Sequence, residues 1–153
     1  MKIIIALFCA STLLSCAHKT ADMPFLSGSV IEFRAASMLP KLGYAEMTTK
    51  DVNQKIYVSE KVLLSNIDIA SAEVFFSDEK SGPQVELNMT ASGKTKLAQI
   101  TEQNLHKPIA ILVDQRLISA PIVQEKITGG MLKISGITSV AEAKRIVDEM
   151  HGK

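Results

Sequence analysis

The chain has 153 residues, of which 46% are hydrophobic, and its formal net charge is +1. This length and composition are typical of one modest domain with its own hydrophobic core. The near-zero charge and the absence of tryptophan argue against basic surfaces and base-stacking platforms, so no nucleic-acid partner is expected.

Residues 1–15 have the pattern of a bacterial secretion signal. Lys2 precedes an apolar segment that is too short to span a bilayer comfortably, and the segment ends in Leu13-Leu14-Ser15-Cys16. This ending resembles the lipobox of bacterial lipoproteins, in which the cysteine receives a diacylglycerol, with acyl chains such as palmitate, and becomes the new N-terminus. The alternative is a plain secretory signal with a chance cysteine.

The predicted lipid attachment at Cys16 sets further expectations. Residues 16–28 are mostly small and polar and contain a proline, which is typical of a tether, and residues 29–153 are expected to form one domain. Cys9 leaves with the signal peptide and Cys16 carries the lipid, so no disulfide can stabilise the fold. Ala17 resembles an outer-membrane sorting signal. We therefore expect a lipid-anchored protein on the periplasmic face of a membrane of the cell envelope, the outer membrane in a Gram-negative host.

The first part of the predicted domain contains strand candidates separated by a segment without a clear pattern. Residues 30–34 and 55–58 are rich in branched and aromatic side chains and are predicted to be strands. Residues 35–49 include Pro40 and Gly43 and show no clean period. We expect this segment to be irregular, with at most a helical turn.

The clearest local pattern is a hairpin. Residues 72–77 alternate in polarity except at Phe75, residues 78–83 carry turn-forming side chains, and residues 84–89 alternate without exception. Phe75 is either an exposed aromatic side chain that contacts a peptide or a side chain buried under the N-terminal segment. The pattern places Val85, Leu87 and Met89 on one buried face.

Two segments have helical periodicity. Thr90 or Ser92 is expected to cap a helix that runs to about Asn104, ahead of a proline that resists the helical conformation. Ser139 and Glu142 have the spacing of a capping box, and the apolar residues that follow them recur at helical intervals. Each helix is therefore predicted to bury one face.

Residues 109–113 are continuously apolar, which predicts a strand buried on both faces. After a polar break, residues 117–120 are expected to return as an antiparallel partner. Pro121 has no backbone N–H, so this second strand must end there or lie at a sheet edge. Gly129 and Gly130 indicate a turn, since the residues typical of a phosphate loop do not follow them.

The order of predicted elements is strands, helix, strands, helix. Hairpins with short connections indicate an antiparallel sheet, because parallel strands need long crossovers. The predicted fold class is α+β, an antiparallel sheet with two helices packed on one face in a ferredoxin-like arrangement.

A set of short motifs occurs in a characteristic order along the chain. They lie at residues 84–93, 97–101, 108–114, 119–121, 127–130, 134–136 and 141–143. Together they resemble the head of the first large periplasmic domain of SecD, a membrane subunit of the bacterial protein-export machinery. The resemblance covers about residues 55–150, and in that family the head is implicated in handling the emerging polypeptide.

Two departures limit what the resemblance implies. The sequence stops at Lys153, where the family continues into membrane helices, and Gln115 stands where the family usually carries a glycine. We therefore expect the fold to carry over, together with an affinity for extended or unfolded polypeptide. We do not expect proton-driven export to carry over.

No pattern of catalytic or metal-binding residues is apparent in the sequence. Metal-ligand spacing does not link His18, His106 and His151, and Ser119 lacks the surroundings of a nucleophile elbow. We therefore expect no catalytic residue, no metal, no cofactor and no enzyme activity.

The leading hypothesis is a lipid-anchored periplasmic protein associated with protein export. Its partner would be unfolded or exported polypeptide, or an envelope or export protein, bound by strand addition at an open sheet edge. The alternative is a structural or interaction module of the cell envelope that reuses the fold without an export role. The candidate partner-binding residues are Phe75, Arg116, Pro121, Gly129 and Gly130.

Overall fold

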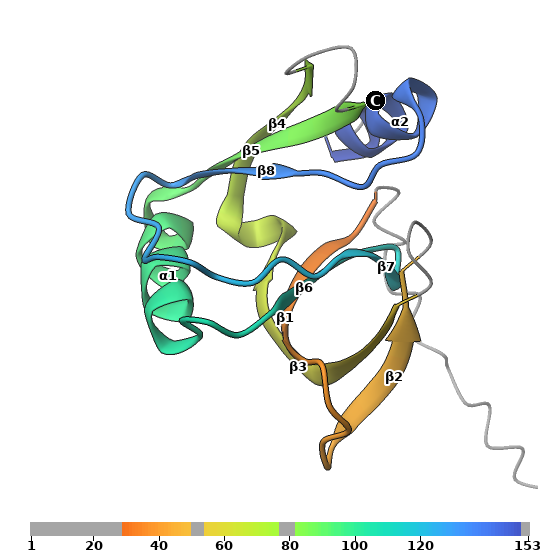
Figure 1. Ribbon diagram of the computed structural model, residues 1–153. Coiled ribbons are helices and arrows are strands. Elements are labelled where there is room, and N and C mark those ends of the chain that lie inside the picture. Colours follow the sequence, from red (N-terminus) through yellow and green to blue (C-terminus); the bar gives the residue numbers. More distant parts are fainter. Residues whose placement is uncertain (1–28, 50–53, 77–81, 151–153) are drawn as a thin grey trace, which may run out of the picture.

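A computed structural model describes residues 29–49, 54–76 and 82–150 (Figure 1). The predicted signal peptide, Cys16 and the tether lie outside the described residues. Within the described ranges, none of the helices has the length and apolar character that a membrane crossing requires. The elements in chain order are β1 (Ile31–Ser37), β2 (Tyr44–Thr48), β3 (Lys55–Ser65), η1 (Asn66–Asp68), β4 (Ile69–Phe76), β5 (Pro83–Met89), α1 (Ala91–Gln103), β6 (Ile109–Val113), β7 (Arg116–Ser119), β8 (Met131–Ile134) and α2 (Val140–Met150).

The strands form two antiparallel sheets. A 5-stranded sheet has the order β2-β3-β1-β6-β7, and a 3-stranded sheet has the order β4-β5-β8. Figure 1 shows the 3-stranded sheet above the 5-stranded one, with α1 and α2 at different sides of the space between them. The predicted α+β class, with antiparallel pairing and two helices, is confirmed.

The division into two sheets differs from the single sheet that the sequence predicts. β3 continues for 11 residues and ends at the short 3-10 helix η1. The Ser65 N–H donates to the Asp68 carboxylate at 3.2 Å and closes this turn. β4 leaves the turn in a new direction and pairs with β5. Local periodicity predicts each hairpin but does not determine which sheet the hairpin joins, because that choice depends on packing between distant strands.

The prediction for residues 35–49 is wrong. β1 extends to Ser37, and Tyr44–Thr48 form β2, which pairs with the first half of β3. The strand predicted at residues 55–58 is likewise only the start of β3. Residues 44–48 read as irregular because no residue of β2 is fully buried, and Met47 is its one apolar residue packed against a core. Without a fully buried face, a strand shows little alternation.

The predicted hairpin at β4 and β5 is confirmed by seven matched positions, from Ile69 opposite Met89 to Phe76 opposite Pro83. Val85 and Leu87 are completely buried, and Met89 packs at the margin of the same core. The outward face of the hairpin carries Glu73 and Glu86, which lie opposite each other. The alternation of residues 84–89 therefore predicts the buried face correctly.

β6 separates two hydrophobic cores, as its continuous apolar sequence predicts. Ile109, Ile111 and Val113 belong to the main core between the two sheets, whereas Ala110 and Leu112 belong to a second core on the other face of the 5-stranded sheet. All five residues are buried because successive strand side chains point to opposite faces and both faces are covered. β7 returns antiparallel to β6 and ends at Ser119, before Pro121, as predicted.

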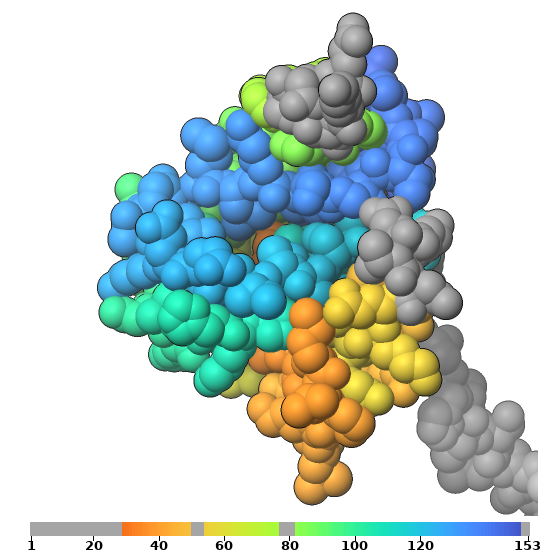
Figure 2. Space-filling view, viewed as in Figure 1, coloured from red at the N-terminus to blue at the C-terminus, as the bar shows by residue number. Residues whose placement is uncertain are grey.

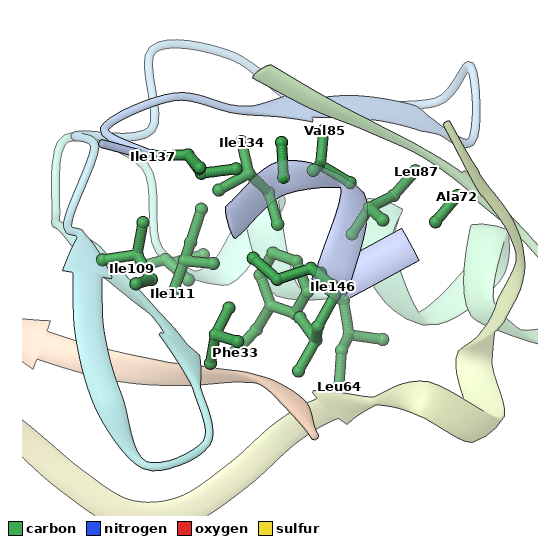
Figure 3. Close-up of a cluster of buried hydrophobic side chains, with 14 of the residues drawn as sticks. Phe33, Leu64, Ala72, Val85, Leu87, Ile109, Ile111, Ile134, Ile137 and Ile146 are labelled. Carbon is green, nitrogen blue, oxygen red and sulfur yellow. The ribbon is translucent and has the colours of Figure 1, made fainter. Parts of the chain in front are cut away.

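Figure 3 shows the main core in detail. Val85 and Ile134 of the 3-stranded sheet lie above Phe33 and Leu64 of the 5-stranded sheet, and Ile146 of α2 lies between them. α1 contributes Leu97 and Ile100 to this core, and α2 also contributes Ala143. Both helices therefore bury their apolar faces in one shared core.

α1 begins as the sequence predicts, with Thr90 as its N-cap. The Thr90 side chain accepts a hydrogen bond from the Gly93 N–H at 3.0 Å, and the Thr90 N–H donates to the Asp68 carbonyl at 2.9 Å. Lys96 then reaches the buried Asp68 carboxylate at 2.7 Å. A Cβ atom added at Gly93 would lie 2.0 Å from the Asp68 carbonyl oxygen. Glycine at this position therefore allows α1 to lie directly against η1.

α2 is capped at Ser139, whose hydroxyl accepts from the Glu142 N–H at 3.1 Å. The Glu142 carboxylate reaches back one residue further than a capping box requires, and it accepts from the Thr138 hydroxyl at 2.7 Å and from the Thr138 N–H at 3.2 Å. The predicted start of the helix is correct, but only the Ser139 half of the predicted capping box forms, because the Glu142 carboxylate accepts from Thr138 in place of the Ser139 N–H.

The turn between β6 and β7 explains why glycine is favoured at position 115, and nothing in the structure explains why glutamine stands there. Asp114 and Gln115 both have positive φ, at 50° and 62°. Two-residue hairpin turns with two positive φ angles favour glycine at the second position, because a side chain there is strained. The Asp114 carboxylate accepts from the Val30 N–H at 3.0 Å and so joins this turn to the residue before β1.

Candidate functional site

An apolar groove lies between the two sheets on the side of β8. Its volume is about 410 Å³. Figure 2 shows a hollow between the blue segment that contains β8 and the blue-green segment before it, with orange atoms of the β1 region visible at its floor. The lining residues are Phe33, Leu97, Thr101, Ile109, Ile111, Pro121, Ile122, Val123, Gln124, Glu125, Ile127, Met131, Leu132 and Lys133.

The floor and inner wall of the groove are extensions of the main core. Phe33 of β1 and Ile111 of β6 are paired neighbours on the inward face of the 5-stranded sheet. Leu97 of α1 also lines the groove and belongs to the same core. Because the strands alternate their side chains, these residues present a continuous hydrocarbon surface to whatever enters the groove.

The outer wall of the groove is the segment of residues 121–127, which is held by backbone hydrogen bonds rather than by a regular strand. The Ile109 N–H donates to the Pro121 carbonyl at 3.0 Å, and the Val123 N–H donates to the Lys107 carbonyl at 3.1 Å. The buried Thr101 hydroxyl accepts from the Ile127 N–H at 3.0 Å. These bonds fix the wall in place while Ile122 remains 45% exposed.

The third side of the groove is the edge strand β8. The Met89 N–H donates to the Gly130 carbonyl at 2.8 Å, which identifies this opposing pair as hydrogen-bonded. Hydrogen-bonded and non-bonded pairs alternate in an antiparallel ladder, so Leu132 also bonds to β5 and Met131 and Lys133 do not. The backbone N–H and C=O groups of Met131 and Lys133 therefore point away from β5. Figure 1 shows that the side of β8 away from β5 faces β6, and none of the strands in the described residues pairs with that side.

The predicted partner-binding residues do not form one site. Pro121 lines the groove, and Gly129 and Gly130 lie in the loop that leads into β8, just outside the lining. Gly130 has a φ of 76°, and a Cβ there would lie 3.0 Å from the Lys94 side chain. The chain bends at these glycines, and their role in binding stays a prediction.

Phe75 and Arg116 lie elsewhere. Ala72 and Val74 face the core, so Phe75 lies on the opposite face of the 3-stranded sheet, where the Lys133 ammonium lies 3.4 Å from the centre of its ring. Arg116, at the start of β7, contacts the Glu142 carboxylate of α2 at 3.1 Å. Both side chains make contacts within the domain, and neither lines the groove.

Sequence reasoning missed most of the groove. Phe33, Leu97 and Ile111 appear in the sequence as ordinary core residues, because nothing in a local pattern distinguishes a buried side chain from one that lines a cleft. The strand β8 carries a detectable signal, since Met131-Leu132-Lys133-Ile134 alternates with Leu132 and Ile134 inward. Its short length and the glycines before it obscured this signal.

Several charged residues outside the groove form structural contacts. Arg145 contacts Glu149 at 2.8 Å, Ser29 at 3.0 Å and Asp114 at 3.3 Å, and so ties the start of β1 to α2. The hydrogen bond from the Ser29 hydroxyl, followed by that from Arg145, lowers the pKa of Glu149. The Thr138 hydroxyl lowers the pKa of Glu142, with further lowering by the Thr138 N–H and Arg116. Among the described residues, no group of three or more His, Cys, Asp or Glu side chains could hold a metal ion.

Comparisons with known proteins point to one family. A family model described as the P1 head subdomain of SecDF matches residues 44–150. The protein translocase subunit SecDF of Thermus thermophilus is 42% identical over 84 residues, which are 55% of this chain and 11% of that protein. The subunit SecD of Calditerrivibrio nitroreducens is 33% identical over 100 residues, which are 65% of this chain and 19% of that protein. The chain therefore corresponds to a small part of these relatives.

The fold agrees with this match. A solved structure described as a membrane component SecDF that enhances protein export has a TM-score of 0.65 and 31% identity, over 81% of this chain and 62% of that one. A SecDF crystal structure in a super-membrane-facing form has a TM-score of 0.64, over 80% of this chain and 18% of that one. The resemblance that the sequence motifs predict is confirmed, and this chain belongs to the SecDF P1 head subdomain family.

Proposed function

We propose that this chain is a lipid-anchored periplasmic protein that binds extended segments of exported or unfolded polypeptide in the groove beside β8. The observation that supports the proposal is the combination of an apolar groove with a strand edge that no other described strand pairs with. The lipid on Cys16 would hold the domain at the membrane of the cell envelope, where such segments emerge. The proposed function is binding, with no catalytic step and no cofactor.

The groove suits short apolar stretches of a polypeptide. Its volume of about 410 Å³ is within the range of small binding sites. It therefore has room for a few apolar side chains at a time. Folded proteins bury such side chains, so a groove of this kind favours segments that have not yet folded. The exposed Ile122 at its rim would lose contact with water when a segment binds.

The edge of β8 provides backbone hydrogen-bonding groups for a bound peptide, in addition to the apolar contacts of the groove. Met131 and Lys133 direct their backbone N–H and C=O groups away from β5, and an extended peptide can pair with both residues. Main-chain pairing does not depend on the sequence of the added strand. A site that combines it with a hydrocarbon surface therefore binds many sequences, as a protein that handles varied export substrates requires.

The relatives support an association with export. Two of them are subunits of the protein translocase, and one solved structure is described as a membrane component that enhances protein export. This chain corresponds to less than a fifth of either translocase subunit, so we infer a contribution to polypeptide binding and not the activity of the whole subunit.

The test is a titration of the full chain with a fluorescent peptide of alternating apolar residues. Ile122→Asp places a charge in the groove and is expected to weaken peptide binding about tenfold or more, because a carboxylate desolvated against hydrocarbon is costly. Ile67→Asp is the matched control, since Ile67 lies in η1, outside the groove lining, and is 81% exposed. Equal affinity of the two variants would contradict the proposal. In cells, unchanged export after deletion of the gene, together with an altered envelope, would favour the alternative of an envelope module.

A further inference from the structure

The connection between β1 and β2 forms a hairpin tip, residues 38–43, that exposes apolar side chains. Leu42 is 100% exposed, Leu39 73% and Met38 41%. Figures 1 and 2 show this tip projecting at the lower end of the molecule, away from the 3-stranded sheet. Single exposed apolar residues are ordinary on protein surfaces, whereas several on one projecting loop mark an interaction site.

The tip is an ordered turn. The Tyr44 N–H donates to the Lys41 carbonyl at 3.1 Å, and Gly43 between them has a φ of 77°. This is the geometry of a β-turn with glycine at its third position, and it places Leu42 at the outer corner. On the other side, the Leu39 N–H donates to the Ser37 hydroxyl at 3.1 Å, and that hydroxyl donates to the Leu39 carbonyl at 2.8 Å. The backbone thus holds both leucines outward.

The polar groups at the tip suit the boundary between water and lipid. The Lys41 ammonium lies 4.5 Å from the centre of the Tyr44 ring and donates to its hydroxyl at 3.1 Å. Tyrosine and lysine are the side chains that anchor proteins at the headgroup level, with apolar neighbours directed into the acyl chains. We propose that the hairpin tip inserts Leu39 and Leu42 into the surface of a phospholipid bilayer.

The length of chain before the described residues supports a bilayer as the partner of the hairpin tip. This inference rests on the lipid anchor at Cys16 in the proposed function. The dozen or so residues between Cys16 and Ser29 reach about 40 Å when fully extended. The chain from Ser29 to Leu39 spans at most about 35 Å. The anchor and the hairpin tip can therefore lie in the same membrane surface.

Insertion of the tip would orient the domain. The acyl chains on Cys16 already give the affinity for the membrane, so the tip adds a second, weaker contact. Two contacts restrict the rotation that a single flexible tether allows. In this orientation the groove and the edge of β8 lie on the part of the domain away from the membrane contact, as Figure 1 shows for the tip and the 3-stranded sheet.

The experiment uses single-tryptophan variants of the full chain, which has no tryptophan of its own. Leu42→Trp places the reporter at the tip, and Ile67→Trp is the matched control at an exposed position in η1. Each variant is mixed with vesicles of phosphatidylethanolamine and phosphatidylglycerol that carry brominated acyl chains. We expect the emission of Leu42→Trp to shift to shorter wavelength and to be quenched, and that of Ile67→Trp to change little. Adding Leu39→Asp to Leu42→Trp should remove the shift and most of the quenching.

The outcomes separate this inference from the proposed function. Chain that sediments with the vesicles while its Leu42→Trp emission is unchanged overturns the inference and leaves the anchor intact. Equal quenching of both reporters also overturns the inference, because it would show that the domain touches the membrane without the tip being the side that inserts. Chain that does not sediment refutes both the anchor and the tip contact. Peptide binding is measured separately with the Ile122→Asp variant and is not affected by any of these results.

Discussion

Replacement of Gly93 by alanine tests the close contact between α1 and η1. Helix propensity alone predicts that Gly93→Ala stabilises the protein by about 1 kcal/mol, because glycine is the poorer helix former. The structure predicts the opposite sign. A Cβ at this position would lie 2.0 Å from the Asp68 carbonyl oxygen and 2.9 Å from its carbonyl carbon. Both atoms belong to the backbone, so the start of α1 must move by more than about 1 Å to reach ordinary contact distances.

The cost of this movement can be estimated from the contacts at the interface. Displacement breaks or lengthens the 2.9 Å hydrogen bond from the Thr90 N–H to the Asp68 carbonyl, which contributes about 1 kcal/mol. Overpacking of a close backbone contact costs a further ~1–3 kcal/mol. After subtraction of the propensity gain, Gly93→Ala is expected to lower the free energy of unfolding by about 2 kcal/mol.

The assay is urea unfolding of the full chain, followed by circular dichroism. A loss of about 2 kcal/mol should lower the unfolding midpoint by about 1 M or more. Gly129→Ala is the matched control, because a Cβ at Gly129 meets no atom within 4 Å and should leave the stability unchanged or raise it by about 0.4–1 kcal/mol. An increase in stability for Gly93→Ala would refute the packing of α1 against η1.

Three further predictions follow from the turn, the second helix and the strand edge. Gln115→Gly should raise the free energy of unfolding by about 0.5–1 kcal/mol, because it relieves a side chain at a φ of 62°; a decrease in a urea titration would contradict this. The pKa of Glu142 in the folded state is lowered from 4.5, so its contribution to stability is present above that value and is lost as the pH falls through the folded pKa. The stability difference between the protein and Glu142→Gln should therefore be largest at neutral pH and shrink below about pH 4.5, and a constant difference would count against the Thr138 contacts. Lys133→Pro removes an outward N–H from β8 and should weaken peptide binding about fivefold, whereas Lys133→Ala retains that N–H and should bind nearly as well; equal loss in both would implicate the side chain instead.

Local patterns in the sequence predict much of the fold. The unbroken alternation of residues 84–89 identifies the buried face of β5, and the apolar run at β6 predicts burial on both faces. The helix starts at Thr90 and Ser139 follow from side chains that satisfy free backbone N–H groups. These features depend on neighbours within a few residues, so a sequence is sufficient to detect them.

The division into two sheets and the groove could not be predicted in the same way. The partner of β4 and the position of β8 depend on packing between residues far apart in the chain. The groove exists because residues 121–127 bond to Lys107, Ile109 and Thr101, and none of the described strands pairs with the outer side of β8. Of the candidate residues predicted from the sequence, only Pro121 lines the groove. The other candidates lie in turns or make packing contacts elsewhere in the domain.

The central claim is that an extended polypeptide segment adds to the free edge of β8. Amide hydrogen exchange of the full chain, measured residue by residue with and without a saturating apolar peptide, tests it most directly. We expect slower exchange at Met131 and Lys133, whose N–H groups point away from β5, and little change at Leu132, whose N–H already bonds to β5. Unchanged exchange at Met131 and Lys133 while the peptide is bound would contradict strand addition at β8.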